Sequence, residues 1–281
     1  MLKLLKPGFF TTLQDSGRFG YRDKGVPVSG VMDAISAKWA NRILQNDAQA
    51  ALLEITMTGP ELIFEQSTVF AVTGAEFDMQ LNETSITTNM AYKATKGDSV
   101  LFGALRKGFR AYLAVKDGFA SPEVLGSKSL YVPITLESHF KKNDIIPFKA
   151  YKGILPPNQM PFALNSVTAE PVLEVYPGPE YAMLSDRQLA QLFSENWSIA
   201  KENDRMAYQL NENLGTHTVS MLTSATLPGT MQYTPSGKLI LLMKDGQTTG
   251  GYPRILQLTE KAICILAQKR TMEKITFKLM R

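Results

Sequence analysis

Short apolar runs separated by turn residues fill the chain from Ala51 to Val115. Glycine, proline, asparagine and aspartate punctuate them, as expected between strands. We read six strands in this part: Leu52–Thr56, Leu62–Glu65, Val69–Val72, Phe77–Leu81, Val100–Phe102 and Arg110–Val115. Short strands at close intervals are typical of a sandwich or a barrel. Thr73-Gly74-Ala75 interrupts one run with a glycine, which predicts a bulge or a close backbone contact.

The second half repeats this pattern with few helices. The predicted strands are Val172–Tyr176, Trp197–Ile199, Met206–Leu210, Met231–Tyr233, Leu239–Met243, Ile255–Leu258 and Ile275–Leu279. Helical spacing predicts a helix from Asp33 to Leu44, capped by Asp33, with Ile35, Trp39 and Ile43 on its buried face. Ser185 and Gln188 form a capping-box pattern, and Thr259 can cap a last helix.

The chain has 281 residues, which is long for a single hydrophobic core. Pro147–Pro161 contains Gly153, Pro156, Pro157 and Asn158 and is the best candidate linker. We therefore predict a β-rich α+β fold with two barrel-like or sandwich-like lobes and a few short helices. The predicted lobes are residues 1–155, which carry a glycine-rich loop, and residues 156–281.

Three polar loops stand out because they lack hydrophobic periodicity. They are Thr11–Arg22, Asn203–Arg205 and Lys244–Arg254, the last following the apolar run Leu239–Met243. Long irregular loops in compact domains are often functional, although a surface loop of turn residues is the plain alternative. Each Arg beside an Asp can equally be a structural pair. Together, the loops predict a cleft for a small anion or amide, since an Arg fork matches a carboxylate.

The composition of the chain excludes several kinds of binding site and catalytic site. The net charge of +4, from 30 Lys and Arg against 26 Asp and Glu, is too mild to indicate nucleic-acid binding. Two histidines and the single Cys264 make an ordinary zinc site unexpected, so we predict no metal ligands. The sequence has no P-loop, dinucleotide fingerprint or nucleophile elbow. The N-terminal apolar stretch is too short for a signal peptide, and we expect a cytoplasmic protein without a membrane span.

Several motifs resemble the KipA-type family, also called allophanate hydrolase subunit 2 or the biotin-dependent carboxyltransferase family. The most specific are Gln14–Arg22 followed by Gly25–Asp33, and Gln247–Pro253. Weaker matches are Ala40-Asn41, Leu53-Glu54, Thr73–Ala75, Leu125–Ser129 and Asp204–Met206, in the same order. The similarity extends nearly from end to end.

The resemblance implies cyclophilin-like barrel character and a component of an ATP-dependent 5-oxoprolinase complex, which opens 5-oxoproline to L-glutamate. It implies a KipI-like (allophanate hydrolase subunit 1-like) partner, a LamB/YcsF-like partner, and Mg-ATP at a shared or partner site. The catalytic candidates, whose donors would stabilise developing charge, are Asp15, Arg18, Arg205, Asp245 and Gln247. The substrate-binding candidates are Gln14, Asn41, Asp204, Thr248, Thr249, Gly250, Gly251 and Tyr252.

Two other functions stay open. One is a carboxyltransferase-like component acting on urea-type or allophanate-type amides. It would need biotin from another protein, because the chain has no Met-Lys-Met carrier motif. The other is a non-catalytic regulatory protein that binds a KipI-like partner.

Overall fold

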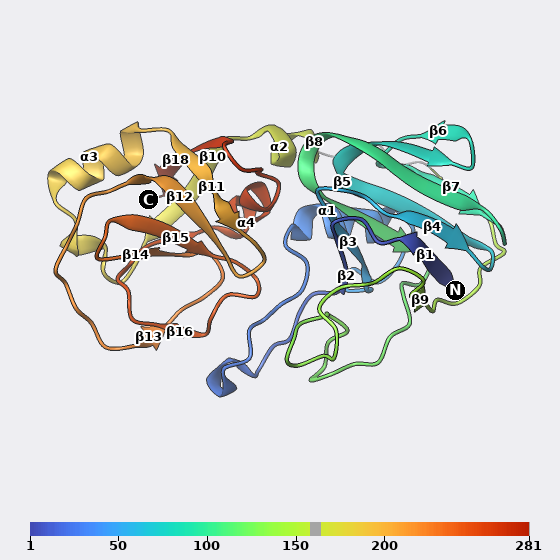
Figure 1. Cartoon of the computed structure of the whole chain (residues 1–281), viewed down its shortest axis with the longest axis horizontal. Coiled ribbons are helices and arrows are strands. Elements are labelled where there is room, and N and C mark those ends of the chain that lie inside the picture. Colours follow the sequence, from blue (N-terminus) through green and yellow to red (C-terminus); the bar gives the residue numbers. More distant parts are fainter. Residues whose placement is uncertain (158–163, 281) are drawn as a thin grey trace. The chain divides into compact units, whose positions relative to one another are not determined.

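The computed structural model describes residues 1–157 and 164–280. The chain divides into two compact units, which are described separately (Figure 1). Unit 1 comprises Met1–Arg18 and Ser29–Thr168, and unit 2 comprises Phe19–Val28 and Ala169–Arg281. The short segment Phe19–Val28 therefore belongs with the second half of the chain, an arrangement that a single cut in the sequence cannot express. Part of the predicted linker, residues 158–161, lies outside the described residues.

Unit 1 is built on one large, mostly antiparallel sheet. Nine strands form it within the described residues: β1 (Leu2–Lys6), β2 (Phe10–Gln14), β3 (Leu52–Thr56), β4 (Glu61–Phe64), β5 (Thr68–Leu81), β6 (Thr84–Ile86), β7 (Ala91–Ala94), β8 (Ser99–Val115) and β9 (Ile145–Ile146). The main path runs β2-β3-β8-β4-β1-β9, and β5 pairs with β6, β7 and β8. Strand β2 lies in a stretch that we had interpreted entirely as loop.

The central pair, β5 and β8, is longer than predicted. Each strand joins two runs that the sequence separates, because the register shifts between Gly74 and Met79 without ending the pairing. Gly74 has a φ of 84°, which a glycine adopts without strain. The predicted irregularity at Gly74 is confirmed, and its effect is to bend a continuous strand.

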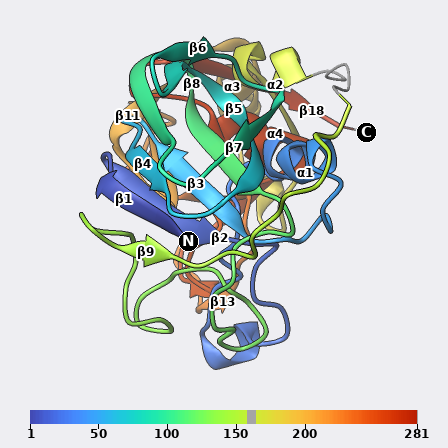
Figure 2. The same ribbon diagram turned by 90° about the vertical axis from the view of Figure 1, so that its right-hand side faces the viewer.

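Helix α1 (Ala34–Ile43) packs against β5 and β8 (Figure 2). Asp33 caps it as predicted, accepting from the backbone nitrogens of Ile35 and Ser36 at 3.1 and 3.0 Å. Trp39 and Ile43 are buried, but Ile35 is 37% exposed. The prediction for Ile35 was wrong because it lies in the first helical turn, outside the stripe that meets the sheet.

Unit 2 is a closed barrel. Within the part of the chain that the structure describes, seven strands close it in the order β10-β17-β14-β15-β12-β11-β18. Their bounds are β10 (Val172–Pro177), β11 (Trp197–Asn203), β12 (Ala207–Asn213), β14 (Thr230–Tyr233), β15 (Lys238–Leu242), β17 (Arg254–Leu258) and β18 (Lys274–Leu279). The β10–β18 pair is parallel, and the other barrel pairs are antiparallel.

Short elements decorate the barrel. Strands β13 (Ser224–Ala225) and β16 (Thr249–Gly250) form a separate two-stranded ladder. The other elements are 3₁₀ turns η1 (Arg22–Lys24) and η2 (Tyr181–Met183), and helices α2 (Leu164–Ala169), α3 (Asp186–Ser194) and α4 (Glu260–Ala267). The predicted capping box at Ser185 and cap at Thr259 are both formed. The β-rich fold with few helices is confirmed.

Candidate functional site

The predicted site residues fall into two groups, one in each unit. Gln14, Asp15, Arg18 and Asn41 belong to unit 1. The other nine, from Asp204 to Tyr252, belong to unit 2. Each group is considered by itself.

In unit 1, Asp15 holds the Ser127–Ser129 loop, which is distant in sequence, at the end of β2. Its carboxylate accepts hydrogen bonds from the hydroxyls of Ser127 and Ser129 at 2.6 and 2.7 Å. It also accepts from the backbone nitrogens of Lys128 at 2.6 Å and Gly17 at 2.8 Å. These contacts join two of the family-like motifs, Gln14–Arg22 and Leu125–Ser129. The carboxylate oxygens are therefore engaged in holding the loop.

Arg18 and Gln14 hold the same loop. Arg18 is fully buried and donates to the carbonyl oxygens of Val124, at 3.1 Å, and Ser129. Gln14, also fully buried, donates to Leu130 O at 3.2 Å. Asn41 donates to Ala50 O at 2.8 Å, which fixes the loop after α1. In unit 1, the predicted residues thus hold backbone segments in place through buried hydrogen bonds.

A second buried polar group lies beneath the start of α1, and we did not predict it. Glu54 and Arg110 are 1% and 2% exposed and approach to 3.8 Å. Glu54 also accepts from Met32 N at 2.7 Å, while Tyr112 accepts from Asp33 N at 2.8 Å. Burial, then the charges of Glu54 and Asp33, raise the pKa of Tyr112 well above its ordinary value. This network anchors the loop that leads into α1.

In unit 2, Arg205 and Asp245 bind each other. Arg205 Nε lies 2.7 Å from Asp245 Oδ2, and Nη2 lies 3.2 Å from Oδ1. The two side chains are 7% and 11% exposed, so this is a largely buried, two-pronged ion pair. Asp204 accepts from the backbone nitrogens of Met206 and Ala207. The Asn203–Arg205 loop and the start of the Asp245 loop are brought together as predicted.

The Gln247–Tyr252 loop lies beside Thr226, a residue that the sequence did not single out. Thr226 donates through its hydroxyl to Gln247 O and through its nitrogen to Thr248 O. Thr249 and Gly250 form β16 against Ala225 and Ser224. Beyond the strand, Gly251 is exposed and the Tyr252 ring is 41% exposed.

Arg22 joins this loop from the N-terminal motif. Its Nη2 donates to Thr226 O. The sequence had placed Arg22 in the motif without assigning it a role. Within unit 2, therefore, the two most specific family-like motifs meet through Thr226.

Arg254 and Glu180 support the same ladder. Arg254 Nη2 lies 2.8 Å from Glu180 Oε1, and its Nη1 donates to Ala225 O at 2.6 Å. The hydrogen bonds from Arg254 lower the pKa of Glu180, and those same bonds raise the pKa of Arg254. Glu180 carried no sequence signal because it lies in a separate turn, 74 residues before its partner.

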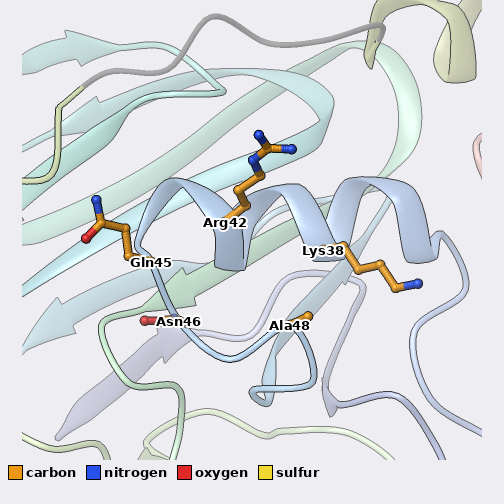
Figure 3. A pocket seen from close by; sticks show the side chains of 5 residues that line it. All are labelled: Lys38, Arg42, Gln45, Asn46 and Ala48. Atoms are coloured by element: carbon orange, nitrogen blue, oxygen red, sulfur yellow. The ribbon is translucent and has the colours of Figure 1, made fainter.

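A pocket of about 430 Å³ lies elsewhere, at the C-terminal end of α1. Its lining residues are Lys38, Arg42, Gln45, Asn46 and Ala48, none of which was predicted. Lys38 and Arg42 point in different directions from the helix (Figure 3). The pocket therefore lacks the convergent polar groups expected of a small-molecule site.

No cluster of three or more His, Cys, Asp or Glu side chains suited to a metal occurs in residues 1–157 and 164–280. Among those residues, no helix is long and apolar enough to cross a membrane.

The architecture is that of a strand-rich protein with two compact units and few helices. Comparison with known proteins identifies the family. The family model for the carboxyltransferase domain, subdomain A and B, matches residues 24–279. The chain belongs to this carboxyltransferase domain family.

Three similar proteins illustrate the family. The C component of the 5-oxoprolinase of Escherichia coli K12 is 32% identical, over 95% of this chain and 87% of that protein. The urea amidolyase of Lachancea kluyveri is 32% identical over 74% of this chain, which matches only 12% of its length. The crystal structure of TTHA0988 has a TM-score of 0.88 at 28% identity, covering 99% of this chain. This chain spans 55% of that one.

Proposed function

We propose that this chain is the carboxyltransferase-domain component of an ATP-dependent 5-oxoprolinase complex. The observation that carries the proposal is the similarity to the C component of 5-oxoprolinase over nearly the full length of both proteins. The reaction consumes 5-oxoproline, ATP and two waters and yields L-glutamate, ADP, phosphate and a proton.

The chemistry requires donors at the amide carbonyl. Opening a stable lactam builds negative charge on its oxygen, and a fixed donor typically contributes about 3 kcal/mol to its transition state. The Gln247–Tyr252 loop offers the amide of Gln247 beside the buried amide of Gln232, which lie 3.3 Å apart. We assign the carbonyl-binding role to this loop. Asp15, Arg18, Arg205 and Asp245 act by holding the loops in place.

Mg-ATP binds on a partner or on a shared surface, because the sequence of this chain lacks a P-loop. The proposed partners are a KipI-like protein and a LamB/YcsF-like protein.

Reconstitution tests the proposal. The chain is co-expressed with the two partners, and formation of glutamate and ADP from 5-oxoproline is measured for the complex and for each component alone. We expect turnover by the full complex and none after this chain is omitted. Full turnover without this chain would contradict the proposal, and full turnover by this chain alone would contradict the shared site.

A second candidate is carboxyl transfer to a urea-type amide, favoured by the family's carboxyltransferase domain and by the similarity to urea amidolyase. This activity would use biotin carried by another protein. Inhibition of turnover by avidin would favour it over the first proposal.

A further inference from the structure

Arg22 has an unusual environment for a charged side chain. One guanidinium nitrogen, Nη2, donates to Thr226 O, whereas Nη1 is buried and has no hydrogen-bond partner among the residues that the structure describes. No carboxylate of those residues pairs with it. By contrast, Arg205 and Arg254 each bind a carboxylate with two nitrogens. Burial lowers the pKa of Arg22, as expected for a desolvated cation without a counterion.

Gln232, on β14, has a matching feature. Its side chain is 1% exposed, and its Oε1 accepts from Gln247 Nε2. Its Nε2 is buried without a partner in the described part of the chain. A buried polar atom left unpaired is costly and calls for an explanation, of which a ligand is one.

Hydrogen bonds connect the two donors. Arg22 binds Thr226, Thr226 binds Gln247, and Gln247 binds Gln232. Gly250 packs directly against Gln232, because a Cβ at this position would lie only 2.2 Å from Gln232 Nε2. All five residues belong to unit 2.

We infer that Arg22 and Gln232 form a subsite for a small amide that carries a carboxylate. Arg22 binds the carboxylate, because a guanidinium is the side chain that matches this group best. Gln232 donates to the amide carbonyl, next to Gln247. The inference rests on the proposed function, and it adds the group by which the substrate is recognised.

The test compares three ligands that differ in one group each. L-5-oxoproline has the carboxylate and the lactam, 2-pyrrolidinone has only the lactam, and tetrahydrofuran-2-carboxylate has only the carboxylate. Binding to the full chain is measured by ligand-observed NMR, and KM and kcat are measured in the reconstituted complex. We expect Arg22→Gln to weaken binding of both carboxylates and raise the KM for 5-oxoproline about 10- to 100-fold. Binding of 2-pyrrolidinone stays unchanged.

Lys24→Gln is the matched control. Lys24 lies in the same 3₁₀ turn and is exposed, so this variant removes one positive charge without touching the subsite. Gln232→Met, which keeps the volume of the side chain, is expected to weaken the binding of 5-oxoproline and of 2-pyrrolidinone alike.

The outcomes separate the subsite from the proposed function. If the complex turns over 5-oxoproline and Arg22→Gln keeps its KM within twofold, the subsite is wrong and the function stands. If the complex does not turn over 5-oxoproline, the binding of tetrahydrofuran-2-carboxylate to the full chain tests the subsite by itself. Binding that is lost in Arg22→Gln supports the subsite, whereas unchanged or absent binding overturns it.

Discussion

At the scale of single residues, buried polar side chains hold the loops of the candidate site in place through hydrogen bonds to their backbone. Asp15 illustrates how a motif residue can hold the backbone of a loop that is distant in sequence. The sequence offers a carboxylate in a glycine-rich loop, and the structure places four donors on it. Three of these donors come from the loop from Ser127 to Ser129, which begins 112 residues further along the chain, and the fourth is the backbone nitrogen of Gly17. Its proposed catalytic part stays a prediction.

Gly250→Ala tests the packing over Gln232. The added Cβ would lie 2.2 Å from Gln232 Nε2, so the buried amide must move, and we expect a loss of about 1–3 kcal/mol in the free energy of unfolding. Urea denaturation measures it.

Gly251→Ala is the neighbouring control, because a Cβ there meets no atom within 4 Å, and it should be nearly neutral. In the double variant Gly250→Ala/Gln232→Ala the shorter of the two clashes is gone and only the 2.8 Å approach to Gln247 Nε2 is left, so the losses should be less than additive. Strict additivity would mean that the two residues are not in contact in solution.

At the scale of elements, capping and periodicity made most helices and strands predictable. Asp33, Ser185 and Thr259 cap the helices expected of them. The missed strands are β2, β6, β7, β9, β13 and β16, because each is short and is stabilised by pairing with another strand instead of by its own pattern. Gln232 gave no signal of a buried site, because a polar residue between the apolar Met231 and Tyr233 of a predicted strand is the ordinary pattern of a strand with one exposed face.

The Arg254–Glu180 pair makes the β13–β16 ladder sensitive to acid. The pKa of folded Glu180 is lowered by Arg254, so the pair stabilises the fold above the unfolded value of about 4.3 and loses this contribution as the pH falls through the lower, folded pKa. Because both side chains are partly exposed, we expect Glu180→Gln to cost about 1 kcal/mol at pH 7. The difference from wild type should vanish in strong acid.

Chemical denaturation between pH 2 and 7 measures this difference. Glu202→Gln is the control, because Glu202 and its partner Lys201 are 49% and 85% exposed. A Glu180→Gln deficit that stays constant down to pH 2 would contradict the prediction.

At the scale of the whole molecule, the family and the β-rich architecture followed from the sequence, while the assignment of Phe19–Val28 to unit 2 did not. The ten residues of this segment have no apolar periodicity that specifies which unit they contact. The contact that matters, Arg22 with Thr226, spans 204 residues. In unit 2, the ion pair between Arg205 and Asp245 brings the Asn203–Arg205 loop next to the start of the Lys244–Arg254 loop, and the cleft predicted from these loops stays a prediction.

Replacing Phe19–Val28 with a glycine-serine linker of the same length tests the role of this segment. The replaced residues lie outside every strand, so we expect the strand signal in circular dichroism to persist. Turnover of 5-oxoproline by the complex should fall at least about 10-fold, because the Arg22 contact is lost.

Restoring only arginine at position 22 of the linker is the informative control. It should recover little, because the 3₁₀ turn that holds Arg22 is still missing. Wild-type turnover by the plain linker variant would rule out a functional role for the segment.

The parallel pairing of β10 with β18 has a consequence for biosynthesis. The barrel cannot close until residue 279 has left the ribosome, because β18 also pairs with β11. Every strand of the unit 1 sheet lies before residue 147 and can assemble earlier, since domains generally fold as units during synthesis. The Phe19–Val28 segment is made before its partner in unit 2, because Thr226 follows Arg22 by 204 residues. We therefore expect the newly made chain to pass through a stage in which unit 1 is folded and the Gln247–Tyr252 loop has not yet made its contacts within unit 2.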